Sequence, residues 1–310
     1  MFYMKSRHLT RITGVLALVA GAAMAVPMVS APVSAATPAE LARGKYIFGA
    51  TGGCGCHTEQ GTPPKPPNSG GRKYEGPFGT VYASNITPDP KTGIGNWTDD
   101  QIITAIRLGR RPNGERLVPV HPYTVFNGMA SEDLQALVAF LRTVPAVNRP
   151  TPPRKLIPLF ESVFLPTWLA AFASREKPPA AAPTSGVARG EYLVRAVAHC
   201  GECHSPRTRT QATDNSRFLG GNPTGPEGEA MPNITPDPET GIGKWSEEEI
   251  ADYLETGNKP DGDVAGGLMA EVIEGNLAGY KIMTKADRLA IAKYLKTIPP
   301  VKNRVEPPKK

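Results

Sequence analysis

Residues 85–97 read NITPDPKTGIGNW and residues 233–245 read NITPDPETGIGKW, so one block occurs twice with two differences in thirteen positions. The two copies are offset by 148 residues. The similarity continues on both sides of the block. The chain therefore contains one structural module written twice.

Helix signals surround each copy of the block. Each copy is followed by a capping-box pattern and then a glycine, which predict the start and end of a short amphipathic helix. The patterns are Thr98 with Gln101, ending near Gly109, and Ser246 with Glu249, ending near Gly257. Upstream, residues 42–44 and 188–190 both read ARG and open a helical stretch that runs into a cysteine cluster. Downstream, residues 131–144 and 284–298 have helical apolar spacing.

All four cysteines lie in two clusters, and the second cluster has a regular motif. Residues 200–204 read CGECH, so Cys200 and Cys203 share one face of a helix. Two thiols on one face can reach both vinyl groups of a haem, while the adjacent His204 supplies an axial nitrogen to the iron. Disulfides, a redox pair or a zinc site are the other uses of such cysteines. The histidine directly after the second cysteine favours covalent haem attachment.

The first cluster is shorter by one residue. Residues 54–57 read CGCH, and the spacing from the upstream ARG segment shows that the residue is missing inside the motif. Cysteines two apart do not share a helix face, so both can form thioethers only if the turn is distorted. We predict that His57 ligates iron and that Cys56 forms a thioether, and we leave open whether Cys54 also does. The alternative is a first module without haem.

The sixth iron ligand of the second module should be a methionine or histidine in a loop well after the axial histidine. Met269 lies 65 residues after His204 and is the predicted ligand. Met231 and Met283 are the competitors, and a methionine can also simply fill the core.

The repeat points to the corresponding ligand of the first module. The 148-residue offset places residue 269 over His121. Neutral imidazole is a good iron ligand, so we predict His121 in this role, over Met129 or a histidine that is merely on the surface. Methionine ligation raises a haem potential relative to two histidines. Electrons would then run from the first module to the second.

Other residues near the motifs are assigned structural roles. His199 precedes Cys200 and is expected to make a local hydrogen bond rather than to bind iron. Trp97 and Trp245 are expected to be core aromatics. The NITPDP segments are interpreted as Asx and proline turns, although their acidic residues could bind a cation.

The stretch between the modules has the composition of a linker. We place the first module at residues 36–146, the linker at 147–187 and the second module at 188–310. The linker is rich in proline, but residues 156–172 (LIPLFESVFLPTWLAAF) are strongly apolar. We expect this segment to pack across the two modules. The alternative is a docking site for a membrane partner, since large exposed apolar patches are uncommon.

Residues 1–35 have the layout of an export signal. Three basic residues precede an apolar stretch at residues 12–29, and small residues follow up to Ala35, the preferred cleavage site. An uncleaved membrane anchor is the alternative. Three of the 35 basic residues lie in this segment, so residues 36–310 carry 32 basic against 29 acidic residues. This near balance does not favour a nucleic-acid partner.

The chain combines ARGxY, CGECHSPR, the doubled NITPDPxTGIGxW block, a loop ligand and a terminal LRTVP or LKTIP helix. This combination resembles the multihaem cytochrome c family. That family includes the cytochrome subunits of membrane-bound alcohol, aldehyde and gluconate dehydrogenases. The resemblance implies an all-α fold of two tandem class I cytochrome c domains, each with a few short helices around a covalently bound haem c and long Pro/Gly-rich loops. It also implies a periplasmic location, with Cys200, Cys203, His204 and Met269 as haem contacts.

Three departures from that family pattern are visible. Those subunits commonly carry three haem motifs, whereas this chain has two. The first motif is short by one residue. His121, in the run Val120-His121-Pro122-Tyr123, occupies the place of the family's methionine in an MPY-like run.

The leading functional hypothesis is a dihaem electron carrier in the periplasm. Its expected partners are redox proteins: a periplasmic or membrane-bound dehydrogenase, a terminal oxidase or another cytochrome, with peripheral membrane association as a further expectation. The alternative is an enzyme, either a dihaem peroxidase or a thiosulfate-type oxidoreductase, in which one iron has an open or displaceable sixth position. A redox or haem sensor is the third class, but the chain offers no output domain for it.

Overall fold

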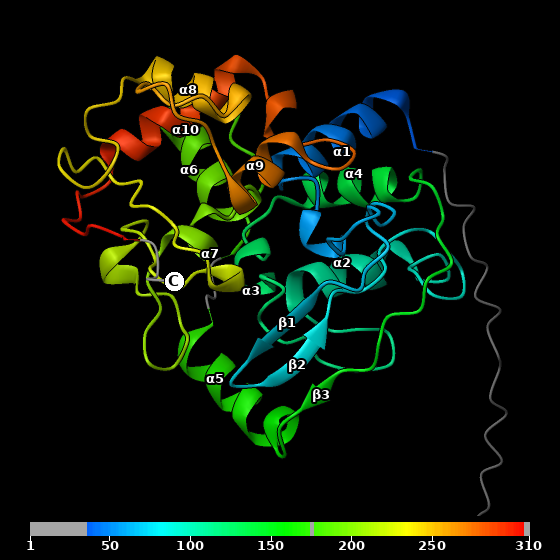
Figure 1. Ribbon diagram of the computed structural model, residues 1–310. Coiled ribbons are helices and arrows are strands. Elements are labelled where there is room, and N and C mark those ends of the chain that lie inside the picture. The colour runs from blue at the N-terminus through cyan, green and yellow to red at the C-terminus, as the bar shows by residue number, and fades with distance from the viewer. Residues whose placement is uncertain (1–35, 174–176, 307–310) are drawn as a thin grey trace, which may run out of the picture. The chain divides into compact units, whose positions relative to one another are not determined.

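Both copies of the repeat form similar sets of helices in the computed structural model, which describes residues 36–173 and 177–306 (Figure 1). The first module contains α1 (Pro38–Ala50), the 3₁₀ turn η1 (Gly55–His57), α2 (Asp99–Leu108), α3 (Tyr123–Phe126) and α4 (Ser131–Leu141). The second contains α6 (Gly186–Tyr192), the wide turn η3 (Leu193–Val197), α7 (Cys200–His204), α8 (Glu247–Thr256), α9 (Gly267–Glu274) and α10 (Lys285–Thr297). Its loops include the 3₁₀ turns η4 (Asn215–Arg217), η5 (Pro226–Gly228) and η6 (Tyr280–Ile282). The predicted export signal at residues 1–35 lies outside the described residues.

The predicted capping boxes are confirmed at the start of α2 and α8. Thr98 accepts a hydrogen bond from the backbone N–H of Gln101, whose side chain accepts one from the backbone N–H of Thr98. Ser246 and Glu249 make the same reciprocal pair. Both helices end at a glycine in the left-handed region, as predicted. The reciprocal bonds satisfy backbone donors that the first helical turn would otherwise leave unpaired.

A close crossing of the first and last helices positions each module's core. α1 packs against α4, and α6 packs against α10. A Cβ atom on Gly44 would collide with the carbonyl group of Ala136, and one on Gly190 would collide with that of Ala290. The glycine of each ARG segment is therefore needed so that two backbones can approach one another.

A small sheet departs from the all-α prediction, although helices dominate the described residues. Strands β1 (Lys73–Gly76), β2 (Gly79–Tyr82) and β3 (Lys155–Leu156) pair antiparallel in that order. The turn between β1 and β2 ends at Gly79, whose φ of 109° suits glycine. The segment Thr80-Val81-Tyr82 consists of residues that favour strands. The hairpin lies in a loop for which the sequence analysis predicted no regular structure.

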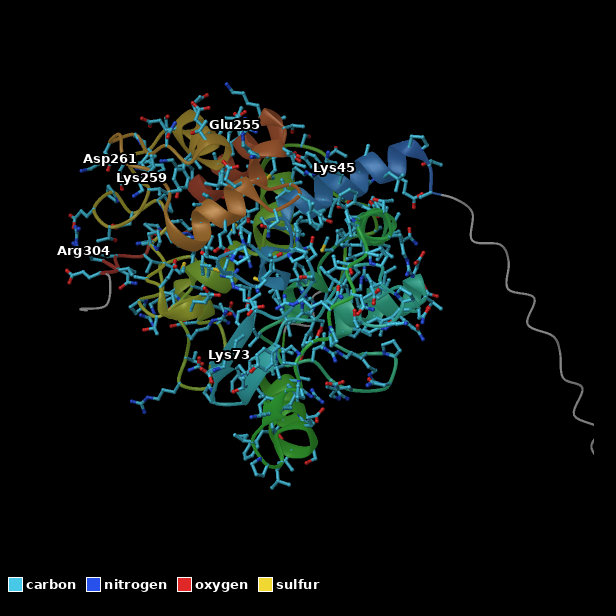
Figure 2. All side chains as sticks on the ribbon, turned by 45° about the vertical axis from the view of Figure 1, so that its right-hand side comes forward. Lys45, Lys73, Glu255, Lys259, Asp261 and Arg304 are labelled. Carbon is cyan, nitrogen blue, oxygen red and sulfur yellow. The ribbon has the colours of Figure 1, made fainter. Side chains whose placement is uncertain are left out.

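The two modules share one core. Buried apolar residues from both copies form a single continuous cluster, which includes Phe48 and Leu134 of the first module and Leu193 and Ile291 of the second. Figure 2 labels six charged side chains outside this cluster: Lys45, Lys73, Glu255, Lys259, Asp261 and Arg304. The sequence repeat therefore marks two modules, and residues 36–310 pack as one unit.

The apolar segment between the modules contacts both of them, as predicted, and also leaves apolar surface exposed. It forms β3, the wide turn η2 (Phe160–Phe164) and α5 (Leu165–Phe172), near the hairpin in Figure 1. Phe160 stacks at 6.2 Å on Phe78 of the first module, and the indole N–H of Trp168 donates to the carbonyl oxygen of Thr210 in the second. The exposed apolar side chains of the segment are Ile157, Leu159, Val163, Phe164 and Phe172. Within the described residues, no helix has the length and apolar character needed to cross a membrane.

Candidate haem-binding sites

The two cysteine motifs fold differently. Residues 200–204 form the helical turn α7, whereas residues 55–57 form the tighter 3₁₀ turn η1. A left-handed residue precedes each turn: His199 with φ 45° and Cys54 with φ 50°. The shorter motif thus places its first cysteine at the left-handed position that a histidine occupies in the longer one. The first motif thus departs from a helical turn, which is the condition under which both of its cysteines could form thioethers.

The two cysteines of the first motif have unlike surroundings. Cys54 is partly buried, its thiol lies 3.5 Å from the hydroxyl of Thr51, and burial raises its pKa to about 11. Cys56 is exposed. In the second motif, burial raises the pKa of both Cys200 and Cys203 to about 12. All four thiols are free, so none is engaged in a disulfide. The thioether at Cys56 stays a prediction.

The histidine of each motif is held by an equivalent backbone carbonyl group. The Nδ1 atom of His57 lies 2.8 Å from the carbonyl oxygen of Ser84, and that of His204 lies 2.8 Å from the carbonyl oxygen of Pro232. Ser84 and Pro232 immediately precede the repeated NITPDP block and obey its offset. With Nδ1 hydrogen-bonded, Nε2 is the nitrogen left for a metal. Burial lowers the pKa of both histidines, which favours the neutral imidazole that binds iron.

The structure brings His121 beside His57. Their ring centroids are 6.1 Å apart and the rings are inclined by 76°. Burial is the main cause that lowers the pKa of His121 to about 3, and the neighbouring His57 and His199 contribute to the same shift. Met129, the competing ligand, is fully buried in the hydrophobic core.

This geometry fits an iron between the two rings of the first module. A metal–imidazole bond is about 2 Å long, so two such bonds in line would put the ring centroids roughly 6 Å apart. The observed separation of 6.1 Å matches that requirement. The donor set of two neutral imidazoles is also one that haem iron accepts. The residues present therefore fit a haem at this position.

The second module has the same anchored histidine but a different partner. Met269 lies on α9 and is partly buried against the core. Met231 and Met283, its competitors, are both buried, and Met283 belongs to the hydrophobic core. The assignment of Met269 as the sixth ligand stays a prediction.

The two motifs lie close to one another. Burial is the largest cause of the raised pKa of Cys203, and the nearby thiol of Cys56 is the second largest. The side chain of Asn276 in the second module donates to the Thr58 hydroxyl, directly after the first motif, at 3.0 Å. A Cβ atom on Gly53 would collide with the carbonyl oxygen of Ala278. Sequence analysis did not predict that the modules meet at their motifs.

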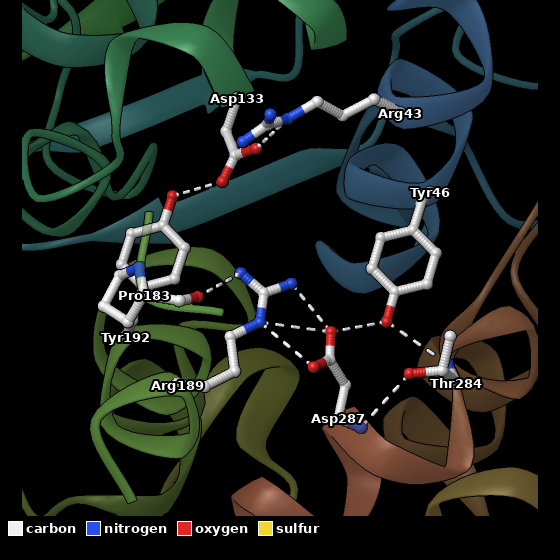
Figure 3. Close-up of polar contacts among 8 residues, drawn as sticks. All are labelled: Arg43, Tyr46, Asp133, Pro183, Arg189, Tyr192, Thr284 and Asp287. Atoms are coloured by element: carbon white, nitrogen blue, oxygen red, sulfur yellow. Dashed lines mark hydrogen bonds and ion pairs between the residues drawn. The ribbon is translucent and has the colours of Figure 1, made fainter. Parts of the chain in front are cut away.

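A pair of reciprocal polar contacts joins the modules (Figure 3). In the first, Asp133 of α4 accepts hydrogen bonds at 2.6 Å from Arg43 of α1 and from the hydroxyl of Tyr192 of α6. The Asp133 side chain is only 1% exposed. The tyrosine comes from the other module, so this buried carboxylate connects the two copies of the repeat.

The second contact mirrors the first. Asp287 of α10 binds Arg189 of α6 at 2.7 Å and accepts a hydrogen bond at 2.6 Å from Tyr46 of α1 (Figure 3). Each module thus supplies an arginine to its own aspartate and a tyrosine to the other module's aspartate. This role does not follow from the spacing of the repeated ARGxY segment, which supplies both the arginine and the tyrosine in each module.

The structural roles predicted for nearby residues are confirmed. Asp89 accepts hydrogen bonds from the backbone and hydroxyl groups of Thr92, and Asp237 accepts the same bonds from Thr240. These are the predicted Asx turns. His199 makes the expected local contact, 3.2 Å from the carbonyl oxygen of Val197. The two tryptophans of the repeat, Trp97 and Trp245, pack against the core.

Comparison with known proteins adds the family. No family model matches the chain. It is 38% identical over 296 residues to a diheme cytochrome c-type protein of Cereibacter sphaeroides, covering 92% of this chain and 96% of that protein. It is 36% identical to the fructose dehydrogenase cytochrome subunit of Gluconobacter japonicus, over 96% of this chain and 60% of the relative. It is 34% identical to the alcohol dehydrogenase (quinone) cytochrome c subunit of Gluconobacter oxydans, over 90% of this chain and 59% of the relative.

The helical modules, the cysteine–histidine motifs and these similarities define a c-type cytochrome. The chain belongs to the family of multihaem cytochromes c that contains the diheme protein and the dehydrogenase cytochrome subunits. It spans about 60% of the length of those dehydrogenase subunits and nearly all of the diheme protein.

Proposed function

We propose that this chain is an exported dihaem cytochrome c that carries electrons from a dehydrogenase or another donor to a respiratory-chain acceptor. The observation that carries the proposal is the pair His57 and His121, whose ring centroids are 6.1 Å apart, close to the separation that an iron between them requires. The equivalent anchoring of His57 and His204 extends it to the second module. Haem c supplies an iron that gains and loses one electron.

The protein's own side chains divide the work between two unlike centres. Cys200 and Cys203 would attach the second haem, and His204 and Met269 would bind its iron. Cys56 attaches the first, and Cys54 is a second candidate for that attachment. Because methionine ligation raises a potential relative to two histidines, electrons pass from the first module to the second. The closeness of the two motifs supports a short path between them.

A periplasmic location and a dehydrogenase partner belong to the same proposal. The sequence of residues 1–35 supports export, with removal of the signal after Ala35. The relatives named as cytochrome subunits of fructose, alcohol and gluconate dehydrogenases support a dehydrogenase as the donor. N-terminal sequencing of the mature protein from a periplasmic fraction tests the location: it should begin at Ala36.

The exposed apolar side chains of residues 157–172 support a surface for that dehydrogenase. Phe164 is 52% exposed and Leu159 is 63% exposed. The variant Phe164→Asp should slow reduction by dehydrogenase-containing membranes and leave the haem spectrum unchanged. Sedimentation of the wild-type protein with protein-free lipid vesicles would instead support peripheral membrane association through this surface.

Mass spectrometry and ligand binding test the core of the proposal. The intact mature protein should carry the mass of two haems, and its peptides should show which of Cys54 and Cys56 bears a thioether. Cyanide should bind neither reduced nor oxidised haem readily, because both sixth positions are filled. A single haem would overturn the dihaem carrier. A high-spin haem that binds cyanide or peroxide readily would favour the alternative, a peroxidase or thiosulfate-type oxidoreductase.

A further inference from the structure

Arg72 lies next to the segment, directly after β2, that orients His57. The carbonyl oxygen of Arg72 accepts a hydrogen bond from the backbone N–H of Ala83 at 2.8 Å, and Gly71 donates to Ala83 at 2.9 Å. The following residue, Ser84, holds the Nδ1 atom of His57. The backbone of Arg72 is therefore fixed by the same element that fixes the axial histidine of the first module.

The side chain of Arg72 crosses to the second module. Only 6% of it is exposed. Its Nη1 atom reaches the carbonyl oxygen of Gly55, within the first motif, and donates to the Glu271 carboxylate at 2.9 Å. Its Nε atom donates to the carboxylate of Glu227. One buried guanidinium thus joins the first haem motif to two carboxylates of the second module.

Glu271 lies on α9, two residues after Met269. The rest of this region also rests on the first module. Val272 lies against Gly52, and Asn276 bonds to Thr58. The helix that carries the predicted sixth ligand of the second haem therefore packs on the motif of the first haem.

The second carboxylate is presented by a strained backbone. Glu227 has a φ of 59°, in the left-handed region that is unfavourable for a residue with a long side chain. Such a conformation persists only where surrounding contacts hold it. The contacts around it are the ion pair with Arg72 and the backbone hydrogen bonds that join Gly225 to Gly228 and Glu229.

We propose that Arg72 is a positioning residue that clamps α9 from the first module and so keeps Met269 on the iron of the second haem. The inference rests on the proposed function, because it assumes a second haem with Met269 as ligand. The planar guanidinium suits the task, since it can bind two carboxylates and a carbonyl group at once in fixed directions. An ammonium group keeps the charge but lacks these directions.

The test is a titration of the oxidised protein with free imidazole. Binding is monitored through the weak red absorption band of methionine-ligated ferric haem. Loosening α9 raises the fraction of molecules in which Met269 is displaceable, and the apparent affinity for an external ligand rises with that fraction. We expect Arg72→Gln to bind imidazole about tenfold more tightly than wild type, within the usual range of coupling between sites. Arg72→Lys should give a smaller increase, and Glu271→Gln should resemble Arg72→Gln.

Lys281→Gln is the matched control, because it removes an exposed ion pair with Glu274 on the same helix. It should leave imidazole affinity at the wild-type value. If Arg72→Gln keeps the wild-type affinity and red band, or if Lys281→Gln changes them equally, Arg72 has no positioning role. If wild-type protein lacks the red band or the second haem, the failure lies in the proposed function instead.

Discussion

The two haem motifs are the same element built with different numbers of residues. In the second module, five residues from Cys200 to His204 complete a helical turn after the left-handed His199. In the first module, the turn is a 3₁₀ turn of three residues, and Cys54 itself adopts the left-handed conformation. Both versions nevertheless hold the histidine through an equivalent carbonyl group at the same 2.8 Å.

The orientation of each motif's histidine is set from outside the motif. The anchoring carbonyl groups belong to Ser84 and Pro232, each at the start of a repeated block whose Asx turns are the same in both modules. The motif can therefore lose a residue while its histidine keeps its orientation. What changes is the environment of the cysteines, because only Cys56 is exposed.

The largest effect should follow from His57→Ala, which removes the axial nitrogen of the shortened motif. We expect the haem content to fall from two per chain to one, measured by the pyridine haemochrome spectrum and by intact mass. His199→Ala is the control and should retain both haems, since the hydrogen bond of His199 goes to a local carbonyl group and its ring packs on Phe126. Two haems in the His57→Ala protein would show that the first module does not depend on this ligand.

His121→Met should make the first centre resemble the second. Exchanging an imidazole for a thioether raises the reduction potential of the haem. We expect the potential of the first haem to rise by on the order of 0.1 V, a small part of the roughly 0.8 V range over which axial ligands set haem potentials. Spectroelectrochemical titration measures the change. Met129→Leu should leave both potentials unaltered because Met129 belongs to the core. The reverse pattern would identify Met129 as the ligand.

The reciprocal tyrosine contacts should differ in strength. Tyr192→Phe removes one of the two hydrogen-bond donors to Asp133, whose carboxylate is nearly fully buried. This change should lower the free energy of unfolding by about 2 kcal/mol. Tyr46→Phe should cost about 1 kcal/mol, because Asp287 keeps its bonds to Arg189. Urea unfolding of the two variants measures the difference. Equal losses would show that the two contacts are energetically equivalent.

The smallest effect concerns the Asx turns, which should respond alike in both modules. Hydrogen bonds from Thr92 and Thr240 lower the pKa of Asp89 and Asp237 below the ordinary value of 3.8. Because the folded-state pKa is the lower one, this stabilisation is present above pH 3.8 and is lost as the pH falls through the lowered pKa.

Asp89→Asn and Asp237→Asn should therefore each flatten the acid side of a plot of thermal midpoint against pH. Asparagine keeps an acceptor oxygen but does not titrate. Asp252→Asn, an exposed substitution on α8, serves as the control and should follow the wild-type curve. Unequal flattening by the two turn variants would mean that the blocks are not equivalent in energy.

Several features followed directly from the residues. The repeat located both modules, the caps of α2 and α8 were predicted residue by residue, and the offset that aligns the NITPDP blocks singled out His121. These features depend on local hydrogen bonds or on the register of a duplicated block, both of which are written in consecutive residues. The hairpin at residues 73–82 was missed because its strands are only four residues long.

The sequence by itself determined the two cysteine–histidine motifs and their unequal lengths. Only the tertiary structure decided that the modules share one core, exchange Tyr46 and Tyr192, and place Arg72 between the first motif and α9. The physical reason is that a ligand motif is defined by neighbours along the chain. Contacts between the modules join residues far apart in the sequence, and the packing of the whole chain selects them.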